Sequence, residues 1–273
     1  MNLQEKYREL LKSKGALLAT NFYNFETLEG VLNAASAKDS PIILQLTPGS
    51  IDYMGLQVAF QMARTALDSQ GVEAWIHLDH GDSYETVARC LDAGFDSVMI
   101  DASEKPVEEN IEITRSVVEL AGKYDACVEA ELGYVAKLGQ SKEKEGYTTP
   151  EEAKRFVDET GVDALAIAIG TAHGFYKSEP RLDLERLTAI RNSVDVALVL
   201  HGSSGVPHKT IQESVRRGIQ KINLATEIKN IFMKTLKKKL ERESEIDLRK
   251  VFPDATSAVT RLVAEKLQIV NLL

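Results

Sequence analysis

The segment from Ala164 to Gly174 reads ALAIAIGTAHG, an apolar run that ends at a glycine and is followed by His173 and a second glycine. The same order recurs at His80 in HLDHG and at His201 in LVLHGSSG. These runs contain no proline and are mostly apolar at successive positions, which is typical of parallel strands covered by helices. We therefore expect three parallel strands that each end near a histidine.

Five further runs of the same kind bring the number of predicted strands to eight. The strands are expected at Ala16–Thr20, Ile42–Leu46, Ala74–Leu78, Ser97–Ile100, Cys127–Ala130, Ala164–Ile169, Ala197–Leu200 and Lys221–Leu224. Segments with helical periodicity separate them, among them Thr27–Ala37, Tyr84–Ala93 and Pro150–Thr160. Eight such units predict a single (β/α)₈ TIM-barrel domain over residues 1–273, with extra helices after Glu227. The alternative is a doubly wound open sheet, which rarely reaches eight uniform units.

The composition excludes several classes of function. A formal net charge of −8 argues against general binding of nucleic acid, which requires clustered lysine and arginine. The sequence has no run near the roughly 20 apolar residues of a membrane span, and MNLQEKYREL does not resemble a signal peptide. Cys90 and Cys127 lie in apolar contexts without CxxC spacing, so we expect buried free thiols and a cytoplasmic protein.

The three histidines are candidate metal ligands. In a TIM barrel the functional side chains lie on the loops that follow the strands, so His80, His173 and His201 should meet at one end. Three neutral imidazoles with an open fourth position are the ligand set of a catalytic zinc site. The chain contains five histidines in all, which makes this placement of three of them a specific signal.

Acidic residues flank the predicted metal ligands. Asp79 precedes His80, and because only one of two neighbours on an ideal strand faces the barrel axis, we expect the strand to end before His80. Asp79 would then act as the proton-transferring group on a bound substrate or, alternatively, would only orient a histidine. Glu131 is expected either as a fourth ligand or as the hydrogen-bonding partner of a ligand.

For three more residues on these strands, a structural role is a possible alternative to a functional one. Glu129 lies deeper in the barrel than Glu131, and an internal ion pair is at least as good an explanation for it. Asp101 is expected either to cap the next helix or to shape the site. His77 is expected to be buried and structural.

The loops after the last three strands are rich in small residues. Glycine lets the backbone approach a ligand, and N–H groups together with hydroxyls form an anion-binding concavity. A phosphate site near strands seven and eight recurs in TIM-barrel enzymes. The candidate phosphate-binding residues are Gly174, Gly202, Ser203, Ser204, Asn223, Leu224, Ala225 and Thr226.

Six motifs, HLDHG, SVMIDAS, VEAELG, AIGTAHG, LVLHGSSG and KINLATE, occur in this order and resemble those of the class II, zinc-dependent ketose-bisphosphate aldolases. That family includes the fructose- and tagatose-1,6-bisphosphate enzymes, and the resemblance runs from about Gly15 to beyond Glu227. The resemblance implies that zinc binds to the three histidines, that Asp79 transfers a proton, and that the glycine-rich loops bind dihydroxyacetone phosphate. It also implies a site near Thr47–Ser50, a monovalent cation (Na⁺ or K⁺) held by carbonyls near Gly174 and Gly202, and a homodimer or homotetramer.

The resemblance further implies the reaction. Zinc acts as a Lewis acid in place of the lysine Schiff base of the other aldolase class, and Asp79 takes the proton of the C4 hydroxyl as the C3–C4 bond breaks. The products are dihydroxyacetone phosphate and an aldehyde. Ala225 and Glu227 in NLATE resemble the tagatose-type enzymes more than the fructose-type ones.

One loop departs from the family pattern. The family usually has a GGxED-type acidic pair after ELG, whereas this chain reads YVAKLGQSKEKEGY over residues 134–147. Glu143 or Glu145 is expected to replace the missing acid, and we assign the role to Glu143. Lys142 and Lys144 are alternatively partners for a second anionic group on the substrate. Further candidates for that group, each with a surface role as the alternative, are Lys177, Arg181 and Arg249.

Two other functions compete with the aldolase. A metal-dependent hydrolase on the same barrel usually carries an HxH pair on its first strand, and here that strand reads ATNFYN. The altered loop favours a non-catalytic sugar-phosphate-binding assembly subunit, whereas the intact Asp79 and the three histidines weigh against it.

Overall fold

The computed structural model describes residues 1–133, 136–137, 146–176 and 178–272, and in them the strands form a closed parallel barrel. The strand order around the barrel is β1-β10-β9-β7-β5-β4-β3-β2, which confirms the TIM barrel and excludes the open sheet. The strands are β1 (Leu17–Asn21), β2 (Ile42–Leu46), β3 (Ala74–Gly81), β4 (Ser97–Ile100), β5 (Cys127–Leu132), β7 (Ala164–Ile167), β9 (Ala197–Leu200) and β10 (Lys221–Leu224).

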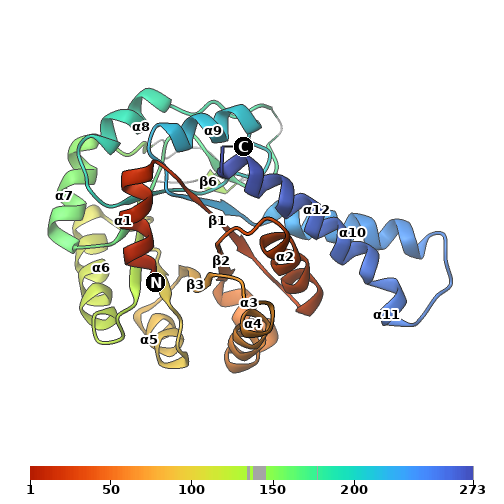
Figure 1. The fold of residues 1–273 in the computed structure, drawn as a ribbon. Helices are drawn as coiled ribbons and strands as arrows, with labels where there is room; N and C mark the ends of the chain where they lie inside the picture. The colour runs from red at the N-terminus through yellow and green to blue at the C-terminus, as the bar shows by residue number, and fades with distance from the viewer. Residues whose placement is uncertain (134–135, 138–145, 177, 273) are drawn as a thin grey trace.

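Most of the helices surround this barrel on its outer side (Figure 1). The helices are α1 (Leu3–Ser13), α2 (Phe25–Ala37), α3 (Pro48–Met54), α4 (Leu56–Gln70), α5 (Tyr84–Ala93), α6 (Val107–Ala121), α7 (Pro150–Thr160), α8 (Leu184–Arg191), α9 (His208–Arg216), α10 (Thr226–Leu240), α11 (Leu248–Val251) and α12 (Pro253–Val270). Capping residues fix several helix ends: Thr149 caps the start of α7, and Gly94 and Gly161 end α5 and α7 in the left-handed conformation. Among the described residues, no helix is both long and apolar enough to cross a membrane.

The apolar core has two parts, and their positions decide where polar chemistry can occur. The larger part fills the space between the strands and the surrounding helices. The smaller part fills the barrel interior at the amino ends of the strands, where Leu3, Tyr7 and Leu10 of α1 close it. Since this end is apolar and plugged, the polar residues of the interior collect at the carboxyl ends of the strands.

The segment after Glu227 is mostly helical, as predicted. In Figure 1, α10 and α12 lie side by side and extend with α11 beyond the ring of the other helices, and we call these three helices the arm. The amino-terminal part of α12 packs closely against α2 at Gly30, where a Cβ atom would lie 2.8 Å from the Val259 side chain and 2.9 Å from the carbonyl oxygen of Thr256. This contact fixes α12 to the barrel wall.

A short pair of strands was not predicted. In it, β6 (Ala136–Lys137) pairs in parallel with β8 (Ala172–His173), so a two-residue strand from the divergent loop runs along the backbone of His173. The predicted strand at Ala164–Ile169 ends earlier, at Ile167, and the chain then continues to this second pairing. Both cysteines are buried free thiols, as expected.

Candidate active site

His80 lies within strand β3, so the prediction that the strand ends before it was wrong. The strand continues to Gly81, which pairs with Ile100, and the register shifts between Leu78 and Gly81. His80 itself has a φ of 52°, in the left-handed region that residues other than glycine rarely adopt. This bulge breaks the alternation of side chains, so the neighbours Asp79 and His80 both reach the barrel mouth.

The three predicted ligands converge at that mouth. The ring centroids lie 5.0 Å apart for His80 and His173, 4.8 Å for His80 and His201, and 5.8 Å for His173 and His201. Glu131 joins them, and one ligand atom from each of the four residues lies within 4.8 Å of the others. These side chains come from β3, β5, β8 and the loop after β9, which are far apart in the sequence.

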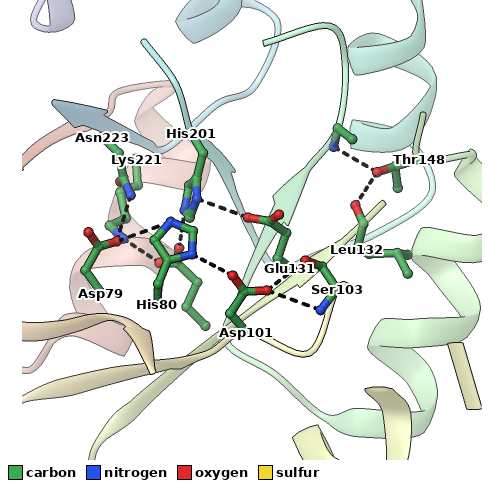
Figure 2. Close-up of polar contacts among 12 residues, drawn as sticks. Asp79, His80, Asp101, Ser103, Glu131, Leu132, Thr148, His201, Lys221 and Asn223 are labelled. Carbon is green, nitrogen blue, oxygen red and sulfur yellow. Dashed lines mark hydrogen bonds and ion pairs between the residues drawn. The ribbon is translucent and has the colours of Figure 1, made fainter. Parts of the chain in front are cut away.

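Carboxylates outside the cluster orient two of the imidazoles. Oδ2 of Asp101 lies 2.7 Å from Nδ1 of His80 (Figure 2), and Oε1 of Glu129 lies 2.9 Å from Nε2 of His201. Each contact occupies one ring nitrogen and leaves Nε2 of His80 and Nδ1 of His201 toward the cluster. Such carboxylate–histidine pairs are the usual support of metal-bound imidazoles.

The donor set fits a metal ion. Nδ1 of His201 and Oε2 of Glu131 lie 3.1 Å apart but are not aligned for a hydrogen bond. Neither of these buried atoms has another hydrogen-bonding partner in the described part of the chain. Buried polar atoms normally have partners, and three imidazoles with one carboxylate oxygen are suitable ligands for zinc. The residues present therefore accommodate such an ion without rearrangement of the fold.

The electrostatics of the cluster favour positive charge at its centre. Burial alone would lower the pKa of His201, but Glu129 and Glu131 outweigh it and raise that pKa to about 10. Burial, together with the positive charges of His201 and His80, lowers the pKa of His173 to about 3. The surrounding carboxylates thus stabilise a cation at a place where burial would otherwise disfavour one.

Asp101 supports the site and does not cap a helix, so the capping alternative was wrong. Helix α6 starts at Val107 with Pro106 at its N-cap, whereas Asp101 accepts hydrogen bonds from the Ser103 hydroxyl and backbone and contacts His80. Burial opposes ionisation of Asp101, but His80 and Ser103 outweigh it and hold its pKa well below the usual range. Its carboxylate is therefore a fixed acceptor for the His80 ring.

We expect Asp101→Ala to weaken the binding of a divalent metal ion by roughly 10–100-fold, because the His80 ring would lose the contact that sets its orientation. Competition with a chromophoric chelator measures this change directly. Ser103→Ala is the matched control: it removes one hydrogen bond to Asp101 but leaves the contact with His80, so its effect should be much smaller. Equal affinities of Asp101→Ala and the unmodified protein would contradict the supporting role.

Asp79 lies beside the cluster and is held by two amides. Nδ2 of Asn21 donates to its Oδ2 at 2.9 Å, and Nδ2 of Asn223 donates to its Oδ1 at 3.4 Å. Its Oδ1 lies 3.9 Å from Nε2 of His80 (Figure 2). Burial opposes ionisation, but His80, other nearby positive charges and the Asn21 hydrogen bond outweigh it and lower the pKa of Asp79.

Below the cluster lies a buried chain of charged and polar groups. Nζ of Lys221 lies 2.6 Å from Oε2 of Glu129 and 3.2 Å from Nε2 of His77, whose Nδ1 lies 2.8 Å from the Ser97 hydroxyl. This confirms that Glu129 belongs to an internal ion pair and that His77 is buried. Because Glu129 also contacts His201, the ion pair connects the barrel interior to the predicted metal ligands.

Two residues of these networks were missed from the sequence. Lys221 is the first residue of the predicted strand KINL and is fully buried. A lysine within a predicted barrel strand could have indicated a buried acidic partner, because lysine is almost never buried unless it is paired. Asn21 is the last residue of β1. It lies at the carboxyl end of a barrel strand, which is where functional side chains are expected in this fold.

A family model for class II fructose-bisphosphate aldolase matches residues 1–272. The chain belongs to this family. The chain is 32% identical to the YdjI aldolase from Escherichia coli K12, with a TM-score of 0.89 and coverage of 98% of this chain and 96% of that one. It is 30% identical to a putative fructose-1,6-bisphosphate aldolase from Coccidioides immitis, with a TM-score of 0.87 and coverage of 98% and 94%.

A fructose-bisphosphate aldolase from Campylobacter jejuni is 20% identical, with a TM-score of 0.85 and coverage of 99% of this chain and 94% of that one, and supports the fold alone. The family is that of the sequence resemblance, and it is generally metal-dependent. The hydrolase alternative therefore has no support. The cluster of His80, Glu131, His173 and His201, which could hold a metal ion, is consistent with membership of this family.

The predicted phosphate loops of this aldolase lie next to one another. Gly202 has a φ of 67°, and a Cβ atom there would lie 2.5 Å from the carbonyl oxygen of Ala172. The Tyr176 hydroxyl donates to the Gly202 carbonyl at 2.8 Å and accepts from the Ala172 N–H. The Ser203 hydroxyl donates to the backbone carbonyl of Asn223. These contacts join the loop after β9 to the segment after β7 and to the end of β10.

The remaining candidates of this region lie at defined places around those loops. Gly174 directly follows β8 with a φ of 109°, and Ser203 and Ser204 are buried. Leu224 ends β10, Ala225 is the N-cap of α10, and Thr226 is the first residue of that helix. At the other predicted contact, Thr47 caps α3 and its hydroxyl lies 3.0 Å from that of Ser50.

Of the candidates for the last proton transfer and for a distal anion, the structure describes Arg181 and Arg249. Glu143, Glu145, Lys142, Lys144 and Lys177 lie outside the described residues. Arg181 is exposed. Arg249 is on the arm and pairs with Asp247 at 3.0 Å, as the surface alternative predicted.

Proposed function

We propose that the protein is a zinc-dependent aldolase that reversibly cleaves a phosphorylated ketose into dihydroxyacetone phosphate and an aldehyde. The substrates proposed are fructose- or tagatose-1,6-bisphosphate or a related ketose 1-phosphate. The observation that carries the proposal is the convergence of His80, His173 and His201 with Glu131, beside the fixed carboxylate of Asp79. A metal site and a proton-transferring carboxylate in contact are the two groups that a retro-aldol reaction of this class requires.

The proposed zinc would be held by His80, His173 and His201, with Glu131 as an exchangeable fourth ligand or as a partner of His201. When bound, zinc supplies Lewis-acid chemistry that polarises the oxygens of the ketose. The contacts of Asp101 and Glu129 keep the ligand nitrogens of His80 and His201 directed at the cluster. The apolar plug closes the opposite end of the barrel interior.

Asp79 is the proposed base of cleavage. With Asn21 and Asn223 each donating to one of its oxygens, the carboxylate is fixed before substrate binds, and remaining lone pairs can accept the proton of the C4 hydroxyl. In the condensation direction the same carboxyl group returns that proton. Glu143 remains our proposal for the final proton transfer.

Unpartnered polar atoms in the mouth favour a polyhydroxylated ligand. In the described part of the chain, Oδ1 of Asn21, Oδ1 of Asn223 and the Thr171 hydroxyl are buried and have no hydrogen-bonding partner. The side-chain amides of Asn21 and Asn223 already hold Asp79 through their N–H groups. Hydroxyl groups of a sugar can donate to the free oxygens, and the phosphate would bind at Gly174, Gly202–Ser204 and Asn223–Thr226.

The test combines zinc content with a coupled assay for dihydroxyacetone phosphate released from fructose- and tagatose-1,6-bisphosphate. We expect release that EDTA abolishes and added zinc restores, and the faster substrate gives the preference at C4. A metal-free protein that cleaves either sugar at the full rate would contradict the zinc assignment. Bound zinc without cleavage of any ketose phosphate in a broad panel would favour the non-catalytic sugar-phosphate binder.

The other expectations remain part of the proposal. A homodimer or homotetramer agrees with exposed apolar side chains at the end of α10 and in the segment before α11, where Leu240 is 53% and Ile246 is 90% exposed. A monovalent cation near Gly174 and Gly202 would share the Gly202 carbonyl with the Tyr176 hydroxyl. A cytoplasmic location and the absence of nucleic-acid and membrane partners also stay predictions.

A further inference from the structure

A buried lysine of the C-terminal helix reaches the predicted phosphate loops. Lys266 lies on α12 and is only 6% exposed. Its Nζ lies 2.8 Å from Oε2 and 3.1 Å from Oε1 of Glu227, so it contacts both carboxylate oxygens. A buried ammonium is costly unless it is paired, and among the described residues Glu227 is the acid paired with it.

Glu227 in turn contacts the loop after β9. Its Oε1 accepts the backbone N–H of Gly205 at 2.7 Å, and its own N–H donates to the Ser204 hydroxyl at 3.4 Å. Gly205 has a φ of 85°, so this N–H is directed by a backbone conformation that glycine adopts without strain. A chain of contacts therefore leads from α12 through Glu227 to Ser204 and Gly205.

This arrangement places a carboxylate directly beside loops proposed to bind a dianion. Glu227 lies in the first turn of α10, one residue after Thr226 and in contact with Ser204. An uncompensated negative charge there would repel a phosphate group. The carboxylate is nevertheless suited to its position, because it fixes the Gly205 N–H and lies at the positive end of α10.

We propose that Lys266 is a positioning residue for phosphate binding, which neutralises Glu227 so that the carboxylate holds the Gly205 loop without repelling the substrate phosphate. The inference rests on the proposed function, since it assigns the phosphate to these loops. It adds a residue of the C-terminal helix, remote in sequence from the six motifs, to the determinants of substrate affinity. Lys266 acts through Glu227 and does not itself touch the phosphate.

The test compares Lys266→Met, Glu227→Gln and the double variant. Methionine keeps the length of the lysine stem, and glutamine keeps an oxygen that accepts the Gly205 N–H but carries no charge. Isothermal titration of the metal-loaded protein with inorganic phosphate and with dihydroxyacetone phosphate gives the affinities. Lys239→Met is the matched control, because Lys239 forms a similar ion pair at 2.7 Å with Asp254 on the arm.

We expect Lys266→Met to weaken the binding of both probes roughly tenfold or more, and the double variant to recover most of that loss. Glu227→Gln should bind at least as tightly as the unmodified protein, and Lys239→Met should bind equally well. Unchanged affinity in Lys266→Met, or an equal loss in the double variant, would overturn charge compensation. Should Lys266→Met fail to fold in thermal unfolding, weaker binding by Glu227→Gln would overturn it instead.

The two levels of the proposal can fail separately. If the unmodified protein binds neither inorganic phosphate nor dihydroxyacetone phosphate, the phosphate assignment fails and the role of Lys266 fails with it. If the unmodified protein binds both probes and Lys266→Met binds them equally well, only the role of Lys266 is wrong.

Discussion

Replacing Asp79 with alanine is expected to lower the rate of the proposed ketose-bisphosphate cleavage by roughly 10²–10⁴-fold while the protein still binds its metal ion. The reason is positional: Asp79 lies beside the three imidazoles but is held by Asn21 and Asn223 and is not one of the clustered ligands. Its loss removes the proton acceptor and leaves the metal ligands in place. Steady-state kinetics together with metal analysis of the same preparation measure both quantities.

Asp82→Ala is the matched control for this substitution. Asp82 is an exposed aspartate three residues further along the chain, just after β3 ends, and it accepts hydrogen bonds from the Ser83 and Thr86 hydroxyls at the start of α5. Its replacement should leave the rate nearly unchanged. If Asp79→Ala loses zinc in proportion to activity, Asp79 is a structural support of the metal site, which was the alternative prediction from the sequence.

Lys221→Met should lower the free energy of unfolding by about 3–5 kcal/mol, because it leaves the charge of Glu129 buried without a cation. Both side chains are almost completely inaccessible to solvent, and their 2.6 Å contact lies inside the barrel. Burial opposes ionisation of Glu129, but Lys221 and the nearby histidines outweigh it and keep its pKa below the usual range. Urea denaturation followed by circular dichroism measures the change.

The double variant Lys221→Met with Glu129→Gln separates the charge from the packing. Glutamine keeps an oxygen toward Nε2 of His201 and removes the charge, so the double variant should recover most of the lost stability. A double variant as unstable as Lys221→Met would mean that the loss comes from packing of the lysine stem. Full stability of Lys221→Met would contradict the buried ion pair itself.

The sequence determined the fold through local patterns that repeat. The helices at Tyr84–Ala93 and Pro150–Thr160 have the predicted bounds, and several predicted strands do as well. Each of these elements is specified by its own residues, through apolar periodicity and through caps such as Thr149 and Gly161. Eight such units admit few architectures, and therefore the barrel was predictable.

The sequence also determined which side chains gather at one end of the barrel. Because parallel strands present their carboxyl ends on the same side, His80, His173 and His201 were predicted to converge, and the structure places them within one cluster. The ordered motifs then indicated the aldolase family, which the family model matches over residues 1–272. Residues 138–145, with Glu143, lie outside the described part of the chain, so their prediction stays open.

Only the tertiary structure decided how these side chains are held. The bulge at His80 depends on pairing with β4, and the choice between a helix cap and a support of the site for Asp101 depended on where α6 begins. The pairs of Lys221 with Glu129 and of Lys266 with Glu227 join residues 92 and 39 positions apart. No local pattern selects such partners, because a buried charge takes whichever opposite charge the closed barrel brings within reach.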